Sequence, residues 1–295
     1  GWPFPLQRIT VNLAPAHTRK EGAGFDLAIA LGVLAAAGTF QPSALERIAV
    51  AGELALDGAV RPVRGALAMA LALEPGRRLV LPPESAREAA ACGADVLAAP
   101  HLADLVAHLR GERALSAPEP AMPVADGCDG DVDLSLVRGQ PVARRALEVA
   151  AAGGHNLLMV GPPGTGKSLL ARCLPTILPP LDEAESLEVS RIHSVAGELA
   201  PGAPLRRRPF RAPHHSISRA AMLGGGNPLR PGEVTLAHRG VLFLDEMPEF
   251  RRDVLEGLRQ PLEDGVVRVA RAHGHLTFPA RPTLVAAANP CPCGY

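Results

Sequence analysis

Residues 161–168 read GPPGTGKS, and this stretch decides the fold of the second half of the chain. It matches the phosphate-binding pattern G-x-x-x-x-G-K-[ST] at every position. The apolar run HNLLMV (residues 155–160) precedes it and predicts a short buried strand, and LLARCL (residues 169–174) begins a helix after it. Glycines let backbone N–H groups turn toward phosphate oxygens, and the helix start adds its positive dipole end. The stretch therefore predicts a P-loop that binds ATP.

Two side chains of the loop have distinct expected tasks. Lys167 is expected to reach the β- and γ-phosphates, and Ser168 is expected to hold Mg²⁺. The remaining nucleotide-binding positions of the loop are Gly161, Pro162, Pro163, Gly164, Thr165 and Gly166. ATP and Mg²⁺ are therefore the predicted cofactors.

Two later strands end in polar residues that such a site needs. GVLFLDE (residues 240–246) predicts a buried strand with Asp245 and Glu246 at its exposed carboxyl end. Asp245 is expected to bind Mg²⁺, and Glu246 to polarise the attacking water as general base. PTLVAAANP (residues 282–290) predicts a third strand that ends at Asn289, where ATPases of this kind carry a polar residue that contacts the γ-phosphate or the water. The predicted catalytic residues are Glu246, Asn289 and the loop lysine.

The first third of the chain alternates strand and helix signals. RITVNLAP (residues 8–15) alternates apolar and polar residues, which is typical of a half-buried strand. A helix is predicted over residues 26–38, and Asp57-Gly58 predicts a hairpin between two apolar runs. These signals predict a small α/β domain over residues 1–113.

Proline, glycine and acidic residues dominate SAPEPAMPVADGCDGDVD (residues 116–133), which predicts no regular element. We therefore expect a linker over residues 114–132 and a second domain over residues 133–295. A chain of 295 residues is expected to form about two domains, which agrees with this division.

The amino-acid composition of the chain limits the kinds of partner that it is expected to bind. Lysine plus arginine and aspartate plus glutamate number 30 each, and aromatic residues make up 3%. This balance predicts neither a basic coat nor an aromatic stacking platform for nucleic acid, although it leaves room for a local basic patch. The longest apolar run, residues 27–37, is shorter than the roughly 20 residues of a membrane helix, so no membrane partner is expected. Five mostly scattered cysteines fit a reducing cytosol and predict a cytoplasmic protein.

Five stretches together resemble one family of P-loop ATPases. They are GQ (residues 139–140), AAAGGHNLLMVGPPGTGKS (150–168), FRAPHHSIS (210–218), HRGVLFLDEMPEF (238–250) and AAANPCPCGY (286–295). The chain resembles the magnesium-chelatase-like AAA+ proteins of the YifB/ComM type over almost its whole length. The resemblance implies an α/β fold in which a Lon-protease-like, ribosomal-protein-S5-like domain precedes a P-loop AAA+ core with a parallel sheet.

The resemblance also implies a function and partners. It implies an ATP-hydrolysing motor that assembles into a ring, with a hexamer as the expected form. The motor is expected to act on DNA, in branch migration or a helicase-like role in natural transformation or recombination. Gln140 joins the nucleotide-binding residues on the same ground. The alternatives are a magnesium-chelatase-type ATPase subunit and a nucleotide-gated protein-remodelling module.

The N-terminal domain is not expected to be a protease. Lon-type proteases use a serine–lysine pair, and alignment with them sets Ala23 or Gly24 at the serine position and Leu67 at the lysine position. Because these positions carry no catalytic nucleophile, we expect the domain to be an interaction module or a module that faces DNA.

The stretch APHHSIS (residues 212–218) lies between the two ATP motifs and has several interpretations. Adjacent residues point apart, so His214 and His215 do not suit one metal ion. A serine–histidine triad would need an orienting acid that the neighbouring sequence does not supply. Two interpretations stay open: a nucleotide-sensing segment at a subunit contact or ring pore, and a capped turn with polar histidines.

Two further stretches are candidate binding sites. DGVVRVARAHGHLTFPARP (residues 264–282) predicts a hairpin, and related ATPases carry a hairpin here that touches DNA. The candidate DNA or pore contacts are Arg268, Arg271, His273, Arg281, His214 and His215. A solvated hairpin face is the alternative. Cys291 and Cys293 form C-x-C, which fits half of a Zn²⁺ site or no metal site at all.

The chain begins without Met and stops just after a strand-like run, which predicts a fragment. Members of the family continue into a helical lid with a nucleotide-sensing arginine and an arginine finger. We therefore expect a chain that lacks the extreme N-terminus and the C-terminal lid, and that hydrolyses ATP poorly by itself.

Overall fold

The computed structural model describes residues 2, 5–14, 20, 22–119, 132–200, 204–226, 229–271 and 274–290, with the backbone alone at residues 270, 271, 274 and 275. Contacts divide the chain into two compact units, Gly1–Val124 with Ser194–Pro204 and Ala125–His193 with Leu205–Tyr295. The expected limits at residues 113 and 132 stay a prediction. Within the described residues, no helix combines the length and the apolar character needed to cross a membrane.

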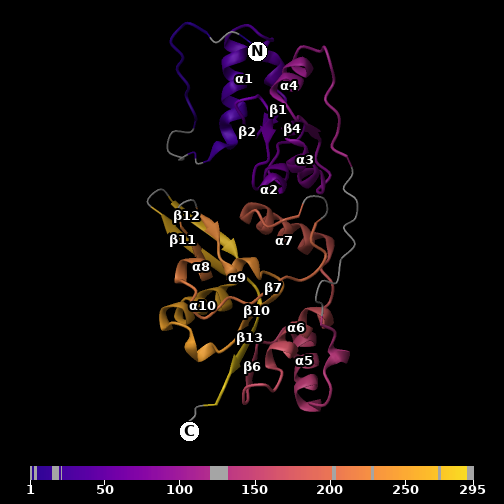
Figure 1. The fold of residues 1–295 in the computed structure, drawn as a ribbon, viewed down its shortest axis with the longest axis vertical. Coiled ribbons are helices and arrows are strands. Elements are labelled where there is room, and N and C mark those ends of the chain that lie inside the picture. The colour runs from indigo at the N-terminus through magenta and orange to yellow at the C-terminus, as the bar shows by residue number, and fades with distance from the viewer. Residues whose placement is uncertain are drawn as a thin grey trace. The chain divides into compact units, whose positions relative to one another are not determined.

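A parallel sheet organises the second unit (Figure 1). Its strand order is β6 (Leu157–Val160), β13 (Thr283–Ala288), β10 (Val241–Leu244) and β7 (Phe210–Arg211), and every neighbouring pair is parallel. The carboxyl ends of these strands therefore lie at one edge of the sheet. The α/β fold with a parallel P-loop sheet that the sequence predicts is confirmed.

The remaining elements of residues 132–290 are helices, short turns and two antiparallel pairs. The helices are α5 (Pro141–Gly153), α6 (Lys167–Ile177), α7 (Glu183–Ala196), α8 (Arg219–Leu223), α9 (Glu233–Leu236) and α10 (Arg252–Asp264), with 3-10 turns at Leu134–Leu136 and Met247–Glu249. The antiparallel pairs are β8 (Gly224–Gly225) with β9 (Arg230–Pro231) and β11 (Val266–Arg271) with β12 (Gly274–Pro279). The β11–β12 pair confirms the predicted hairpin.

Alternate residues of β10 enter two different cores. Val241 and Phe243 pack in the core with α5 and α6, whereas Leu242 and Leu244 pack in the core with α10. All four side chains are buried. A sheet that is covered on both faces needs strands that are apolar throughout, which explains the run VLFL.

β6 differs from the prediction of a buried strand. It lies at the edge of the sheet, with β13 on one side. Leu157 and Met159 are half-buried, but Leu158 and Val160 are 57% and 64% exposed. The prediction was wrong because an apolar run does not reveal how many neighbours its strand will have.

The first unit contains a smaller parallel sheet with the strand order β1 (Ile48–Val50), β4 (Arg78–Leu81) and β5 (Val96–Ala98). A hairpin of β2 (Glu53–Leu54) and β3 (Val60–Arg61) turns at Asp57 and Gly58, as predicted. The helices of this unit are α1 (Asp26–Ala36), α2 (Ala66–Leu71), α3 (Pro83–Ala90) and α4 (Leu102–Leu109). Its Lon-like character stays a prediction.

Residues 8–13 are not a strand, although their alternation predicts one. The side chains of Ile9, Val11 and Leu13 are exposed. A strand needs a hydrogen-bonded neighbour as well as an alternating sequence. Across the described ranges, no strand pairs with this segment.

Candidate functional site

Three strand ends bring the predicted nucleotide-binding residues together. The P-loop follows β6, Asp245 follows β10, and Asn289 follows β13, which lies between the other two strands. The Lys167 ammonium donates hydrogen bonds to Asn289 Oδ1 at 2.9 Å and to the carbonyls of Gly161 and Pro162 at 2.7 and 3.0 Å. The lysine is therefore held inside the loop, beside the end of the neighbouring strand.

Ser168 lies at the start of α6, opposite the end of β10. Its hydroxyl donates a hydrogen bond of 2.7 Å to Asp245 Oδ2. A hydroxyl and a carboxylate are oxygen ligands of the kind that Mg²⁺ takes at nucleotide sites. The two residues that the sequence predicts as metal ligands are adjacent, and their donor set fits Mg²⁺.

Backbone conformation shapes the rest of the loop. Gly164 and Gly166 have φ angles of 79° and 83°, a region that L side chains rarely adopt. A Cβ added at Gly164 would meet no atom within 4 Å, so conformation rather than crowding requires glycine there. Gln140 Nε2 donates a 2.5 Å hydrogen bond to the Thr165 carbonyl, which joins the start of α5 to the loop.

The APHHSIS stretch lies beside the end of β10. His215 Nδ1 is 3.6 Å from Glu246 Oε2, and the ring centroids of His214 and His215 are 4.0 Å apart. Glu246 has a φ angle of 51°, and its side chain is 53% exposed. His215 therefore lies beside the predicted general base, and the His214 ring packs against His215. Their roles toward DNA or a pore stay predictions.

The predicted contacts of the hairpin lie on different parts of it. Arg268 on β11 forms an ion pair of 3.6 Å with Asp264 at the end of α10. Arg281 follows β12, and its backbone N–H donates a hydrogen bond of 3.0 Å to His238 Nδ1. The Arg281 side chain lies against Gly265, where an added Cβ would meet its Nε. Arg281 is thus placed at the base of the hairpin.

Several predicted positions lie outside the described residues. These are His273, the side chain of Arg271, and Cys291 and Cys293 of the predicted half-site for zinc. In the part of the chain that is described, no group of three or more His, Cys, Asp and Glu side chains is arranged to hold a metal ion. The zinc site therefore receives no support from the described residues.

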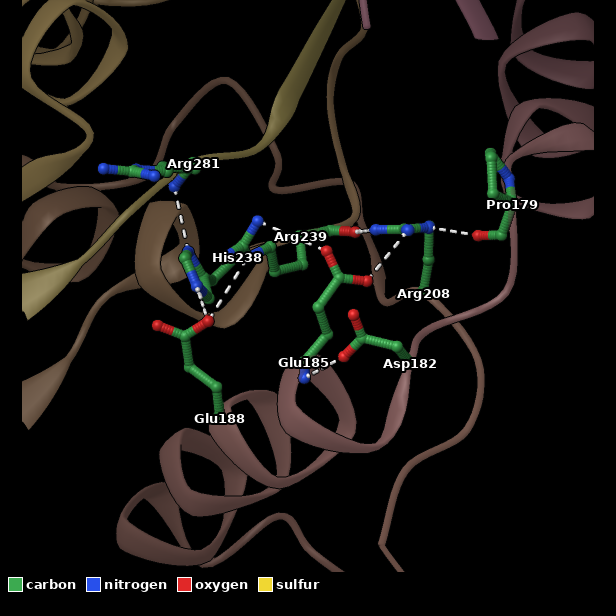
Figure 2. Close-up of polar contacts among 8 residues, drawn as sticks. All are labelled: Pro179, Asp182, Glu185, Glu188, Arg208, His238, Arg239 and Arg281. Carbon is green, nitrogen blue, oxygen red and sulfur yellow. Dashed lines mark hydrogen bonds and ion pairs between the residues drawn. The ribbon is translucent and has the colours of Figure 1, made fainter. Parts of the chain in front are cut away.

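A polar cluster at the other end of β10 was not predicted (Figure 2). Arg239 bridges two carboxylates of α7, with Nη1 3.2 Å from Glu185 Oε1 and Nε 3.2 Å from Glu188 Oε2. Arg208 Nη2 is 3.1 Å from Glu185 Oε2. The other nitrogens of Arg208 donate to the carbonyls of Pro179 and Arg239. The cluster ties α7 to the start of β10.

His238 is buried at the centre of this cluster. Its side chain is 1% exposed, and Nε2 is 3.1 Å from Glu188 Oε2. Burial lowers the pKa of His238 below its usual value, and the Glu188 carboxylate offsets only part of this effect. Burial acts to raise the pKa of Glu188, but the nearby His238 side chain and the hydrogen bond and charge of Arg239 bring it below its usual value. A neutral imidazole therefore faces an ionised carboxylate near neutral pH.

A cavity of about 540 Å³ lies next to the cluster. Its polar lining includes Arg208, Arg239, Arg281, Glu185, Glu263 and Asp264. These residues lie toward the amino ends of the strands, whereas the P-loop follows the carboxyl end of β6. The cavity is therefore separate from the nucleotide-binding residues, and its opposite charges already neutralise one another in part.

Comparison with known proteins adds an independent finding. A family model described as "Magnesium chelatase, subunit ChlI" matches residues 133–295, and one described as "Subunit ChlI of Mg-chelatase" matches residues 1–85. The uncharacterized protein YifB of Escherichia coli is 45% identical over 100% of this chain and 58% of its own length. Competence protein ComM of Haemophilus influenzae is 45% identical over 99% of this chain and 58% of its own length. The uncharacterized protein Rv2897c of Mycobacterium tuberculosis is 48% identical over 99% of this chain and 59% of its own length. The chain thus spans less than two thirds of the length of these relatives.

Proposed function

Because this chain belongs to the magnesium-chelatase-like AAA+ family of the YifB/ComM type, we propose that it binds Mg²⁺–ATP at the P-loop and hydrolyses it. Two contacts across strand ends support the proposal most directly, Lys167 to Asn289 at 2.9 Å and Ser168 to Asp245 at 2.7 Å. They bring a cation, an amide, a hydroxyl and a carboxylate to one edge of the sheet. Binding and positioning of a triphosphate require such a set.

Each residue has a defined task in this proposal. Lys167 exchanges its carbonyl partners in the loop for β- and γ-phosphate oxygens. Ser168 and Asp245 hold Mg²⁺, which neutralises negative charge on the phosphates when it is bound. Glu246 accepts a proton from the attacking water, and Asn289 orients the water or the γ-phosphate.

Two substitutions in the full-length protein separate binding from hydrolysis. Glu246→Gln keeps the shape of the side chain and removes the base, so we expect unchanged ATP affinity and a loss of about a hundredfold or more in kcat. Lys167→Ala is expected to weaken binding itself. A fluorescent ATP analogue and a phosphate-release assay measure the two effects, with the exposed α5 substitution Arg145→Ala as control. Wild-type turnover in Glu246→Gln would reject Glu246 as the base.

We further propose that hydrolysis drives a cytoplasmic ring, expected to be a hexamer, on DNA in branch migration or a helicase-like role. The name of one relative, competence protein ComM, supports a role in natural transformation or recombination. The exposed Arg268 on the β11–β12 hairpin offers a cation for backbone phosphate. Branched DNA is therefore expected to stimulate ATP hydrolysis by the full-length protein. A rate that is indifferent to DNA would reject the DNA motor.

A second candidate is a magnesium-chelatase-type ATPase subunit or a protein-remodelling module, which the descriptions of the two family models favour. Stimulation of ATP hydrolysis by a protein partner instead of DNA would distinguish it.

For the first unit we propose a non-proteolytic, Lon-like interaction module. Leu67 supports this assignment, because a fully buried leucine occupies the position where the resemblance expects a catalytic lysine. Casein cleavage that survives Lys167→Ala would reject it.

A further inference from the structure

Gln140 has an unusual backbone conformation at the start of α5. Its φ and ψ angles are 51° and 52°, which is the left-handed region that residues with a Cβ rarely adopt. The next residue is Pro141, and a residue before proline normally takes an extended conformation. Such strain persists where the surrounding structure imposes it, often at functional sites. The backbone of Gln140 therefore directs attention to what its side chain contacts.

The side chain of Gln140 contacts the P-loop instead of its own helix. A residue at the N-cap commonly accepts a hydrogen bond from the first helical turn, but among the described residues the side chain of Gln140 makes no such bond to α5. Its Nε2 donates instead to the Thr165 carbonyl at 2.5 Å. The same nitrogen would lie 3.7 Å from a Cβ added at Gly166. The amide thus lies against the last two loop residues before Lys167.

The peptide bond between Thr165 and Gly166 explains what this contact can do. A trans peptide is planar, and its C=O and N–H groups point in opposite directions. Because Gln140 holds the Thr165 carbonyl, the Gly166 N–H is directed away from Gln140. Backbone N–H groups of a P-loop donate the hydrogen bonds that cradle phosphate oxygens. One side-chain hydrogen bond therefore fixes the direction of a backbone donor that Gln140 does not itself touch.

The start of α5 is a firm support for the loop. Leu147 and Ala151 of α5 are buried in one core with Leu170 and Leu174 of α6, the helix that follows the loop. The two helices that flank the Gln140 contact are therefore packed together. This packing keeps the amide of Gln140 at a constant place relative to the loop.

The bond from Gln140 also differs from the other bonds that hold the loop. Lys167 donates to the carbonyls of Gly161 and Pro162, but the proposed function moves its ammonium to the phosphates when ATP binds. The bond from Gln140 to Thr165 uses no group that has a task toward phosphate. It can therefore stay in place through binding, and a loop that is ordered in advance costs less to order when the ligand arrives.

We propose that Gln140 is a positioning residue for the P-loop, and that its amide holds the Thr165–Gly166 peptide so that the Gly166 N–H faces the phosphates of ATP. The inference rests on the proposed function, because it assigns a role at the same nucleotide site. Gln140 acts here on the loop and not on the nucleoside. Its effect is therefore the same for any ligand that carries the triphosphate.

The first test measures the affinity of the full-length protein for Mg²⁺–ATP and for inorganic triphosphate with Mg²⁺, by displacement of a fluorescent ATP analogue. Gln140→Ala and Gln140→Gly both remove the amide, and each is expected to raise Kd about fivefold to tenfold for both ligands. At saturating ATP, kcat is expected to stay within about twofold, because the loop contacts are alike in the ground and transition states. Gln260→Ala is the matched control, since that amide lies 3.5 Å from Asp264 on the exposed side of α10.

The second test separates positioning from a general effect on stability. Both variants lack the amide, but only Gln140→Ala keeps a Cβ in the left-handed conformation. Without nucleotide, the Tm of Gln140→Gly is therefore expected to exceed that of Gln140→Ala by about 2–4 °C. Their affinities for ATP are expected to be equal. If Gln140 served stability alone, affinity would follow Tm, and Gln140→Ala would bind ATP more weakly than Gln140→Gly.

The outcomes separate this inference from the proposed function. If Lys167→Ala weakens ATP binding but both Gln140 variants keep the wild-type affinity, the inference alone is overturned. It is also overturned if the variants bind inorganic triphosphate normally and only ATP weakly, because Gln140 would then contact the nucleoside. Affinities that follow Tm in the two variants would overturn it as well. If Lys167→Ala keeps the wild-type affinity for ATP, the proposed function fails and this inference fails with it.

Discussion

His238 Nε2 lies 3.1 Å from Glu188 Oε2, and this contact joins the start of β10 to the middle of α7. His238 Nδ1 accepts the backbone N–H of Arg281, so the neutral ring carries its proton on Nε2, toward Glu188. One imidazole therefore connects three segments of the second unit: α7, the approach to β10, and the chain that follows the β11–β12 hairpin. Figure 2 shows how these side chains converge.

Acidification is expected to destabilise the second unit through His238. Burial holds the pKa of His238 below its usual value of about 6.5, so the unfolded chain binds the proton more readily than the folded chain does. The stabilising contribution is present above about pH 6.5 and is lost as pH falls toward the folded-state pKa. His238→Asn retains an acceptor for the Arg281 N–H and does not titrate. It should therefore show a shallower fall in the free energy of unfolding between about pH 7 and pH 5.5.

Hydrogen exchange of the β10 amides during urea titration measures this free energy for the second unit specifically. The range stays above the region in which carboxylates titrate, so Glu188 does not contribute to the difference. Equal slopes for wild type and His238→Asn would show that His238 is not the group responsible.

Removal of the Glu188 carboxylate is expected to cost more than removal of an exposed one. Glu188→Ala removes the carboxylate that lies 3.1 Å from the buried His238 Nε2 and leaves part of Arg239 without a partner, at a cost of about 1–3 kcal/mol. Glu256 pairs with Arg252 at 2.7 Å on the exposed side of α10, and Glu256→Ala is expected to cost only about 0.3–0.5 kcal/mol. Urea denaturation of both variants makes the comparison. Similar losses would mean that the cluster contributes no more than a surface pair.

Magnesium dependence tests the ligand pair at the P-loop. Asp245→Asn is expected to raise the Mg²⁺ concentration needed for half-maximal ATP binding by about tenfold or more, because one anionic oxygen is lost beside Ser168. Chelation of Mg²⁺ with EDTA is expected to abolish hydrolysis in the wild type. Asp253→Asn on α10 is the control, since its carboxylate pairs with Arg251 at the surface. An unchanged Mg²⁺ requirement in Asp245→Asn would contradict the assignment.

Two glycine substitutions are expected to have opposite signs. A Cβ at Gly240 would collide with the Pro209 carbonyl, which accepts the Val241 N–H where β7 meets β10. Gly240→Ala is therefore expected to destabilise the second unit by about 1–3 kcal/mol. Gly32 lies inside α1 with no atom within 4 Å of an added Cβ, so Gly32→Ala is expected to stabilise the first unit by about 0.5–1 kcal/mol. Thermal unfolding of both variants checks the two signs.

The nucleotide-binding residues were predictable because their signals are local. A P-loop needs a strand, a glycine turn and a helix within about a dozen residues, and Asp245 and Asn289 each follow directly on an apolar run. The sheet then brings these local pieces together, since strands that run parallel end at the same edge. The hairpin after α10 was predictable for the same reason.

Features that depend on neighbours could not be predicted in this way. Whether Leu158 is buried depends on a strand beside β6, and whether residues 8–13 form a strand depends on a partner. The polar cluster joins Glu185 and Glu188 of α7 to Arg208 and Arg239, which lie 23 and 51 residues further along the chain than their partners and share no motif with them. The stretch His238-Arg239 was visible in the sequence, but only the structure shows the carboxylates that it meets.

The placement of β10 has a consequence for communication within the second unit. The strand has hydrogen-bonded neighbours on both sides and is buried at all four residues, so it is poorly suited to bending. Asp245 and Glu246 follow one end of the strand, and His238 and Arg239 lie just before the other end, so the four residues of β10, roughly 13 Å long at about 3.3 Å per residue, separate the two pairs. If the Asp245 and Glu246 carboxylates move during a catalytic cycle, we therefore expect β10 to move as one stiff element. Such a movement would reach α7 through the contacts of His238 and Arg239. The polar cluster is the place where such a movement would first become visible outside the nucleotide site.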